Sequence, residues 1–92
     1  MADDTLTNLR KQIDAIDESI LDLLEKRMMI TDEVGKYKIS QGLPVLNTAR
    51  EKEMLERLRN LCKHPVLKES ITDIFSQIII ASKNSQNIIK KI

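Results

Sequence analysis

Three observations in the 92-residue sequence predict an all-α fold with one very long helix and two shorter ones. Apolar residues recur at steps of three and four along most of the chain, which is the period of an α-helix. Only two glycines and two prolines are present, so few positions can interrupt a helix. Gly42, Pro44 and Pro65 divide a single domain over residues 1–92 into helices of about 5–40, 48–62 and 65–91.

The first helix is predicted from a heptad-like row of side chains, which we call the apolar seam. The apolar seam consists of Leu6, Leu9, Ile13, Ile16, Ile20, Leu23, Arg27, Ile30, Val34 and Tyr37. Gly42 suits the end of this helix, because glycine accepts the backbone conformation that closes a helix, and Pro44 follows shortly after. Gly35, inside the helix, leaves room for another backbone to approach closely.

The second and third helices open with recognisable start signals. Thr48-Ala49-Arg50-Glu51 matches a capping box, in which Thr48 and Glu51 would close the first turn. Pro65 suits the first position of the third helix. The apolar face of the second helix comprises Met54, Leu55, Leu58 and Leu61. The predicted inward stripe of the third comprises Leu67, Ile71, Ile74, Ile78, Ala81, Ser85, Ile88 and Ile92.

The length of the first helix predicts an oligomer. A helix of about 35 residues spans roughly 50 Å, whereas a compact chain of this length has a radius of gyration of about 12 Å. The helix must therefore protrude with its apolar seam uncovered. Because such a row is unstable in water, we expect a second copy of the chain to cover it in a homodimer of interlocked helices.

Composition argues against several function classes. Aromatic residues make up 2% of the chain and the net charge is +1, which argues against a nucleic-acid partner. One cysteine and one histidine are too few for a metal centre, so we expect no metal and no cofactor. The longest apolar run, residues 78–81, is too short for a membrane span. The acidic start shows no signal peptide, so we expect a cytoplasmic protein without a membrane partner.

Cationic residues interrupt the helical pattern. Arg27 stands in the apolar seam, where a guanidinium needs an anion such as Glu51 or a bound carboxylate, unless its head reaches water. Lys38 lies about 16 Å further along and within about 20° of the same face, so these two cations can hold a small dianion. Arg10 lies about 25 Å from Arg27 along the helix and can reach such a site only from an antiparallel partner chain.

Polar residues on the other two helices extend this pattern. Arg50 and Glu51 lie at the entry of the apolar face of the second helix, although the capping box explains Glu51 equally well. The stripe of the third helix is interrupted by small and polar residues, namely Ala81, Ser82, Ser85 and Gln86. These residues mark either a solvated patch, a close helix crossing or a polar pocket. Together with the cations, they favour a pocket that binds a multiply anionic small molecule, or converts it by charge stabilisation and positioning.

Several spaced motifs resemble one known family. The motifs are Leu9-Arg10-x-x-Ile13-Asp14-x-Ile16-Asp17, Leu23-Leu24-x-x-Arg27, Val34-Gly35-x-x-Lys38, Pro44-Val45, Arg50-Glu51 and Ser82-x-x-x-Gln86. Over about residues 6–90 the chain resembles the all-α class of chorismate mutase. The resemblance implies three helices per chain, intertwined in a homodimer with two active sites shared between the chains. It also implies a Claisen rearrangement of chorismate to prephenate, the branch step toward phenylalanine and tyrosine, without cofactor, metal or covalent intermediate.

The resemblance further implies a role for each matching residue. The implied catalytic residues are Arg10, Arg27, Lys38 and Gln86, and further substrate-binding residues are Asn47, Arg50, Glu51 and Ser82. Arg10 of the opposite chain and Arg27 would bind carboxylates, and Lys38 and Gln86 would donate to the ether oxygen as its bond to carbon breaks. Glu51 would accept from the ring hydroxyl, with Arg50 and Ser82 along the carboxylate side. Asn47 stands where relatives often carry aspartate, and an asparagine oxygen should substitute.

Two alternative functions stay open from the sequence. A lyase of the same fold, which releases pyruvate from isochorismate, would need the same cations. A non-catalytic helical module for dimerisation or effector binding would explain the apolar seam without any reaction.

Overall fold

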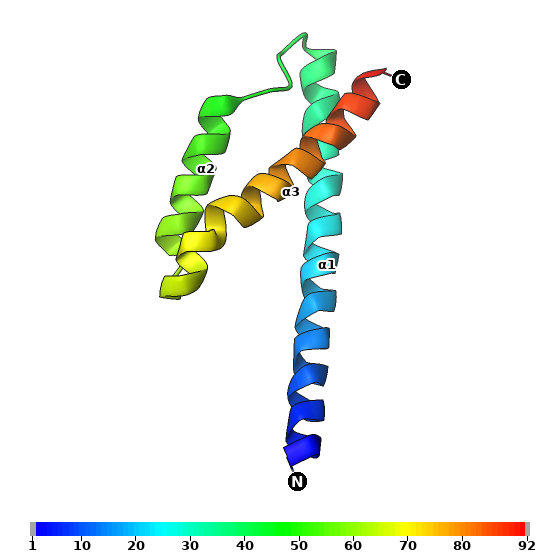
Figure 1. The fold of residues 1–92 in the computed structure, drawn as a ribbon. Helices are drawn as coiled ribbons and strands as arrows, with labels where there is room; N and C mark the ends of the chain where they lie inside the picture. The colour runs from blue at the N-terminus through cyan, green and yellow to red at the C-terminus, as the bar shows by residue number, and fades with distance from the viewer. Residues whose placement is uncertain (1, 92) are drawn as a thin grey trace.

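The computed structural model describes residues 2–91, with side chains from residue 4 onward, and confirms the all-α fold. The helices are α1 (Ala2–Ser40), α2 (Thr48–Leu61) and α3 (Pro65–Lys91) (Figure 1). The helix α1 begins three residues earlier than the sequence predicts and α2 ends one residue earlier, whereas the bounds of α3 agree. Within residues 2–91, no helix combines the length and the hydropathy needed to cross a membrane.

The three helices form an open, elongated arrangement. The helix α3 crosses the C-terminal half of α1 and also packs against α2, while the N-terminal half of α1 extends alone (Figure 1). The chain measures 61 × 28 × 14 Å and has a radius of gyration of 17.2 Å. A compact chain of this length has a radius of gyration of about 12 Å, so the predicted protrusion of the first helix is confirmed.

The C-terminus of α1 is closed by a Schellman motif. Gly42 has a φ of 66°. Its N–H donates to the carbonyl of Ile39 at 3.2 Å, and the N–H of Leu43 donates to the carbonyl of Lys38 at 2.8 Å. This pair of bonds satisfies carbonyls that the helix leaves free, and it requires a left-handed residue, which glycine supplies without strain. The helix thus ends at Ser40, and Gly42 turns the chain toward α2.

The predicted capping box at the start of α2 is wrong. Asn47 is the N-cap, and its Oδ1 accepts from the backbone N–H of Arg50 at 3.0 Å. Thr48 is therefore already inside the helix, and the Glu51 side chain bonds to Lys83 on α3. Asparagine competes well for this position because its short side chain reaches the free N–H groups of the first turn.

The faces that pack within one chain agree only in part with the predicted ones. On α3, Ile71, Ser82 and Gln86 of the predicted stripe are buried, and so is Ile79, which was not predicted. Leu67, Ile74 and Ile88 of that stripe are exposed, and Ile92 lies outside the described residues. On α1, the side turned toward α3 carries Leu24, Met28, Thr31 and Gly35, all of them buried or half-buried. The helices α1 and α3 thus each have two apolar faces, and α3 covers only one face of α1.

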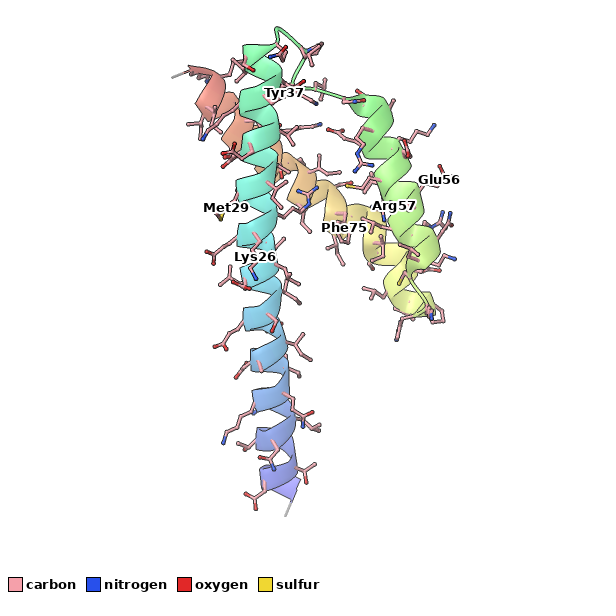
Figure 2. All side chains as sticks on the ribbon, turned by 180° about the vertical axis from the view of Figure 1, so that it is seen from behind. Lys26, Met29, Tyr37, Glu56, Arg57 and Phe75 are labelled. Carbon is pink, nitrogen blue, oxygen red and sulfur yellow. The ribbon has the colours of Figure 1, made fainter. Side chains whose placement is uncertain are left out.

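Most of the apolar seam lies on the face of α1 that α3 leaves uncovered, although its one charged member, Arg27, bonds to Ser82 of α3. The apolar and aromatic members of the seam keep between 42% and 65% of their surface exposed. Met29, beside the seam, points away from α2 and α3 (Figure 2). A single chain therefore leaves a long apolar surface in contact with water, which is unfavourable by roughly 25 cal/mol for each Å².

Candidate active site

A cavity of about 420 Å³ opens between the C-terminal half of α1, the start of α2 and the C-terminal half of α3. It gathers most of the residues that the sequence singled out, which are Arg27, Lys38, Asn47, Arg50, Glu51, Ser82 and Gln86. These residues come from all three helices and from the connection before α2. Their convergence requires the crossing of α3 over α1, which places Ser82 and Gln86 opposite the cations of α1.

Arg27 is held in place by two neighbours on the cavity wall. One terminal nitrogen donates to Ser82 Oγ at 2.8 Å, and the other lies 3.7 Å from Met54 Sδ. Ser82 Oγ in turn donates to the carbonyl of Ile78 at 3.3 Å. Of the partners that the sequence leaves open for Arg27, Glu51 is not the one observed, because it bonds to Lys83 instead. A guanidinium has five N–H donors, so several remain for an anion in the cavity.

Lys38 and Gln86 are each anchored by one backbone carbonyl. Lys38 Nζ donates to the carbonyl of Val45 at 3.2 Å, and Gln86 Nε2 donates to the carbonyl of Thr31 at 2.7 Å. An ammonium has three N–H groups and an amide nitrogen has two, so each side chain keeps at least one donor for a ligand. Gln86 is buried and does not titrate, whereas Lys38 brings a positive charge.

Gly35 sets the distance between α1 and α3 at this site. A Cβ placed on Gly35 would lie 2.9 Å from Cγ of Gln86, which is too close for a carbon contact. The space that Gly35 leaves is therefore taken by the side chain of Gln86, whereas the sequence predicts a close approach of another backbone there. Nearby, Ser85 Oγ donates to Asp32 Oδ1 at 2.6 Å and ties the same two helices together.

Two charged residues of the cavity were missed by the sequence reasoning. Lys83 lies next to Ser82 and Arg57 lies seven residues after Arg50, and both line the cavity. Arg57 follows Arg50 by almost two helical turns and therefore shares its face of α2. Lys83 directly follows Ser82 and comes three residues before Gln86 on α3. This spacing could have indicated that both cations belong to the site. A cation on a helix face is usually solvated, however, and is therefore weak evidence for a binding site by itself.

Arg10 lies outside this cavity. It is exposed on the free half of α1, seventeen residues before Arg27, which corresponds to about 25 Å along the helix. No rotation of the side chain bridges that distance within one chain.

The cavity is strongly cationic. Arg27, Lys38, Arg50, Arg57 and Lys83 line it, against a single carboxylate from Glu51. Within the described side chains, no group of three His, Cys, Asp or Glu residues is placed to hold a metal ion. The arrangement suits an anionic small molecule of more than one negative charge, held by charge-assisted hydrogen bonds.

Comparison with known proteins agrees with this geometry. The pattern of one family, described as chorismate mutase type II, matches residues 9–87. The chain belongs to the chorismate mutase type II family. This confirms the resemblance stated from the sequence motifs, and it makes the chain a member of a family of isomerases.

Individual chorismate mutases resemble the chain along most of its length. The chorismate mutase of Methanocaldococcus jannaschii is 37% identical over 75 residues, covering 82% of this chain and 76% of that protein. The structure of chorismate mutase (form II) from Thermus thermophilus matches with a TM-score of 0.86 and 33% identity, covering 89% of this chain and 93% of that one. The T-protein of Enterobacter agglomerans is 39% identical over 83 residues, so the chain spans 22% of that relative.

Proposed function

We propose that this chain catalyses the rearrangement of chorismate to prephenate, within the synthesis of phenylalanine and tyrosine. The observation that carries the proposal is the cavity in which Arg27, Lys38 and Gln86 present free donors to one space. Family membership supports the same reaction, since the relatives from M. jannaschii and T. thermophilus are named chorismate mutases.

The residues of the cavity match the demands of a pericyclic reaction. Such a step needs no nucleophile or general base, only a compact substrate and stabilisation of the negative charge that develops on the ether oxygen. Lys38 and Gln86 supply two anchored donors for that oxygen. An acceleration of about 10⁶ requires about 8 kcal/mol, and one preorganised donor typically contributes about 3–4 kcal/mol. Two donors together with carboxylate contacts therefore suffice in magnitude.

The remaining wall residues fit the two carboxylates and the hydroxyl of chorismate. Arg27 would hold one carboxylate, with Arg50 and Ser82 beside it. Glu51 would accept from the ring hydroxyl. Asn47 uses its Oδ1 to cap α2, which leaves its amide nitrogen to donate toward the substrate.

The proposal includes a homodimer in which each site is completed by Arg10 from the other chain. The chain exposes 7620 Å² of surface, against about 5,500 Å² for a compact monomer of this mass. The difference of about 2,000 Å² is in the range of an obligate interface. An antiparallel partner along the apolar seam would bury this surface and bring its Arg10 to the cavity.

The direct test is to incubate the purified chain with chorismate and, separately, with isochorismate. We expect prephenate from chorismate and no pyruvate from isochorismate. Release of pyruvate from isochorismate would identify a lyase of the same fold. No turnover of either compound would favour a non-catalytic helical module and would reject the proposal.

The substitution Arg27→Met separates a catalytic site from a merely structural one. Because Arg27 contacts neutral partners, Ser82 and Met54, a methionine of similar length should leave the fold and the dimer intact. We expect kcat/KM for chorismate to fall by about 10²–10³-fold, as for the loss of one key charged donor. Sedimentation and thermal unfolding check the assembly; activity within a few-fold of wild type would contradict the assignment.

A further inference from the structure

Lys83 takes part in the cavity, although no motif of the family resemblance includes it. Its Nζ lies 2.8 Å from Glu51 Oε1 and 3.1 Å from Oε2. The ammonium thus contacts both oxygens of the single carboxylate in the cavity. The side chains keep only 34% and 25% of their surface exposed, so the pair is partly shielded from water.

This ion pair differs from the others in the described part of the chain. Lys26–Asp22 and Lys36–Glu33 are neighbours on α1 and keep 60–75% of their side-chain surface exposed. Exposed ion pairs of this kind contribute little to stability, because water screens the charges and both side chains lose conformational freedom. The Lys83–Glu51 pair instead joins α3 to the first turn of α2, and both residues line the cavity.

The contact with Lys83 fixes the position of the Glu51 carboxylate. A glutamate side chain samples many rotamers, and near a cluster of cations it has several competing partners. Within residues 4–91, Lys83 is the cation in ion-pair contact with Glu51, although Arg27 and Arg50 line the same cavity. The contact therefore selects one placement of the carboxylate. An ionised carboxylate offers about four lone-pair sites, so it can accept from a ligand hydroxyl while Lys83 holds it.

We infer that Lys83 is a positioning residue that fixes the Glu51 carboxylate for the ring hydroxyl of the substrate. The inference rests on the proposed function and deepens it, because it assigns the hydroxyl-recognising element to a pair of residues from two helices. Lys83 also neutralises Glu51, so that the carboxylate does not weaken the attraction of the other cations for the dianion.

The matched variants are Lys83→Met and Lys90→Met, each measured as the full chain with chorismate. Lys90 is an exposed lysine of α3, seven residues and about 10 Å beyond Lys83 on nearly the same face, so it controls for the loss of a charge. We expect Lys83→Met to lower kcat/KM about tenfold, since a misplaced contact group is costly, and Lys90→Met to stay within about twofold. Lys83→Arg, which keeps the charge, should recover most of the loss, and unfolding midpoints check that every variant is folded.

A double-mutant cycle with Glu51→Gln identifies the route of the effect. If Lys83 acts through Glu51, Lys83→Met should cost less than about twofold once Glu51 is glutamine. A full loss in both backgrounds would overturn the inference and show that Lys83 contacts the substrate itself. Equal activity of Lys83→Met and Lys90→Met would overturn it as well. A wild-type chain without mutase activity would instead reject the proposed function, and this inference with it.

Discussion

At the scale of single residues, the site is built from side chains whose free donors are fixed by backbone contacts. Lys38 is tied to the carbonyl of Val45 and Gln86 to the carbonyl of Thr31, and neither contact uses all the N–H groups of its side chain. Donors held in this way need little reorganisation when charge develops on a substrate oxygen, which is the condition for strong electrostatic stabilisation. Gln86 supplies this donor without a charge that changes with pH.

The substitution Gln86→Glu tests this role. An ordinary glutamate has a pKa of about 4.3, so at pH 8 the new carboxylate would be ionised and would repel the developing negative oxygen. We expect kcat/KM at pH 8 to fall by at least about 100-fold and to recover as the pH falls and the carboxyl becomes a donor. The wild-type pH–rate profile is the control, and it should be flat around neutrality. A variant as active as wild type at pH 8 would refute the role.

At the scale of elements, the start of α2 serves both the fold and the site. Asn47 caps the helix, and its neighbours Arg50 and Glu51 in the first turn face the cavity. The cap therefore fixes the direction from which these two side chains enter. The sequence placed the cap one residue too late, because Thr48 and Glu51 also satisfy the capping-box pattern.

Alanine variants distinguish the two possible caps. Asn47→Ala should lower the free energy of unfolding by about 1 kcal/mol, the usual contribution of an N-cap. Thr48→Ala, one position later and outside the cap, should change it by less than about 0.5 kcal/mol. Urea unfolding at matched protein concentration measures both, since the stability of a dimer depends on concentration. A larger loss of unfolding free energy for Thr48→Ala than for Asn47→Ala would show that Thr48 caps the helix, as in the capping box.

At the scale of the whole molecule, the proposed function requires a second copy of the chain to complete each site. The cavity of one chain holds cations for a dianion, but Arg10 lies about 25 Å away on the free half of α1. The same half of α1 carries the seam residues from Leu6 to Leu23, all of which are exposed. A single antiparallel partner would cover the apolar seam and would also bring its own Arg10 to the cavity. One dimer would therefore explain both the exposed seam and the distance of Arg10 from the cavity.

Subunit mixing tests the shared site. Arg10→Ala and Arg27→Ala should each abolish most activity when alone. In a mixed dimer, one site would combine intact Arg27 with intact Arg10, and the other site would lack both. Because half of randomly exchanged dimers are mixed, the mixture should recover about a quarter of wild-type activity. Mixing without recovery, after exchange has been verified by sedimentation of a tagged chain, would show that each site is complete within its own chain.

The sequence alone was sufficient for the fold class and the three helices, and most of the site residues that it predicts line one cavity. Helix periods, glycine and proline breaks, and the Gly42 turn are local features, so the neighbouring residues determine them. Arg27 and Lys38 were recognisable because a charge in an apolar pattern needs a specific partner. Lys83 gave no such signal, because a lysine on a polar helix turn is normally solvated.

Only the tertiary structure decided which side of each helix packs within the chain, and which partner each charge takes. The helices α1 and α3 each carry two adjacent apolar faces, and the helical period fits either of them equally well. The crossing of α3 at Gly35 selects Leu24, Met28 and Thr31 on α1, and leaves most of the apolar seam exposed. The same crossing brings Lys83 to Glu51, residues 32 positions apart whose contact no local pattern encodes.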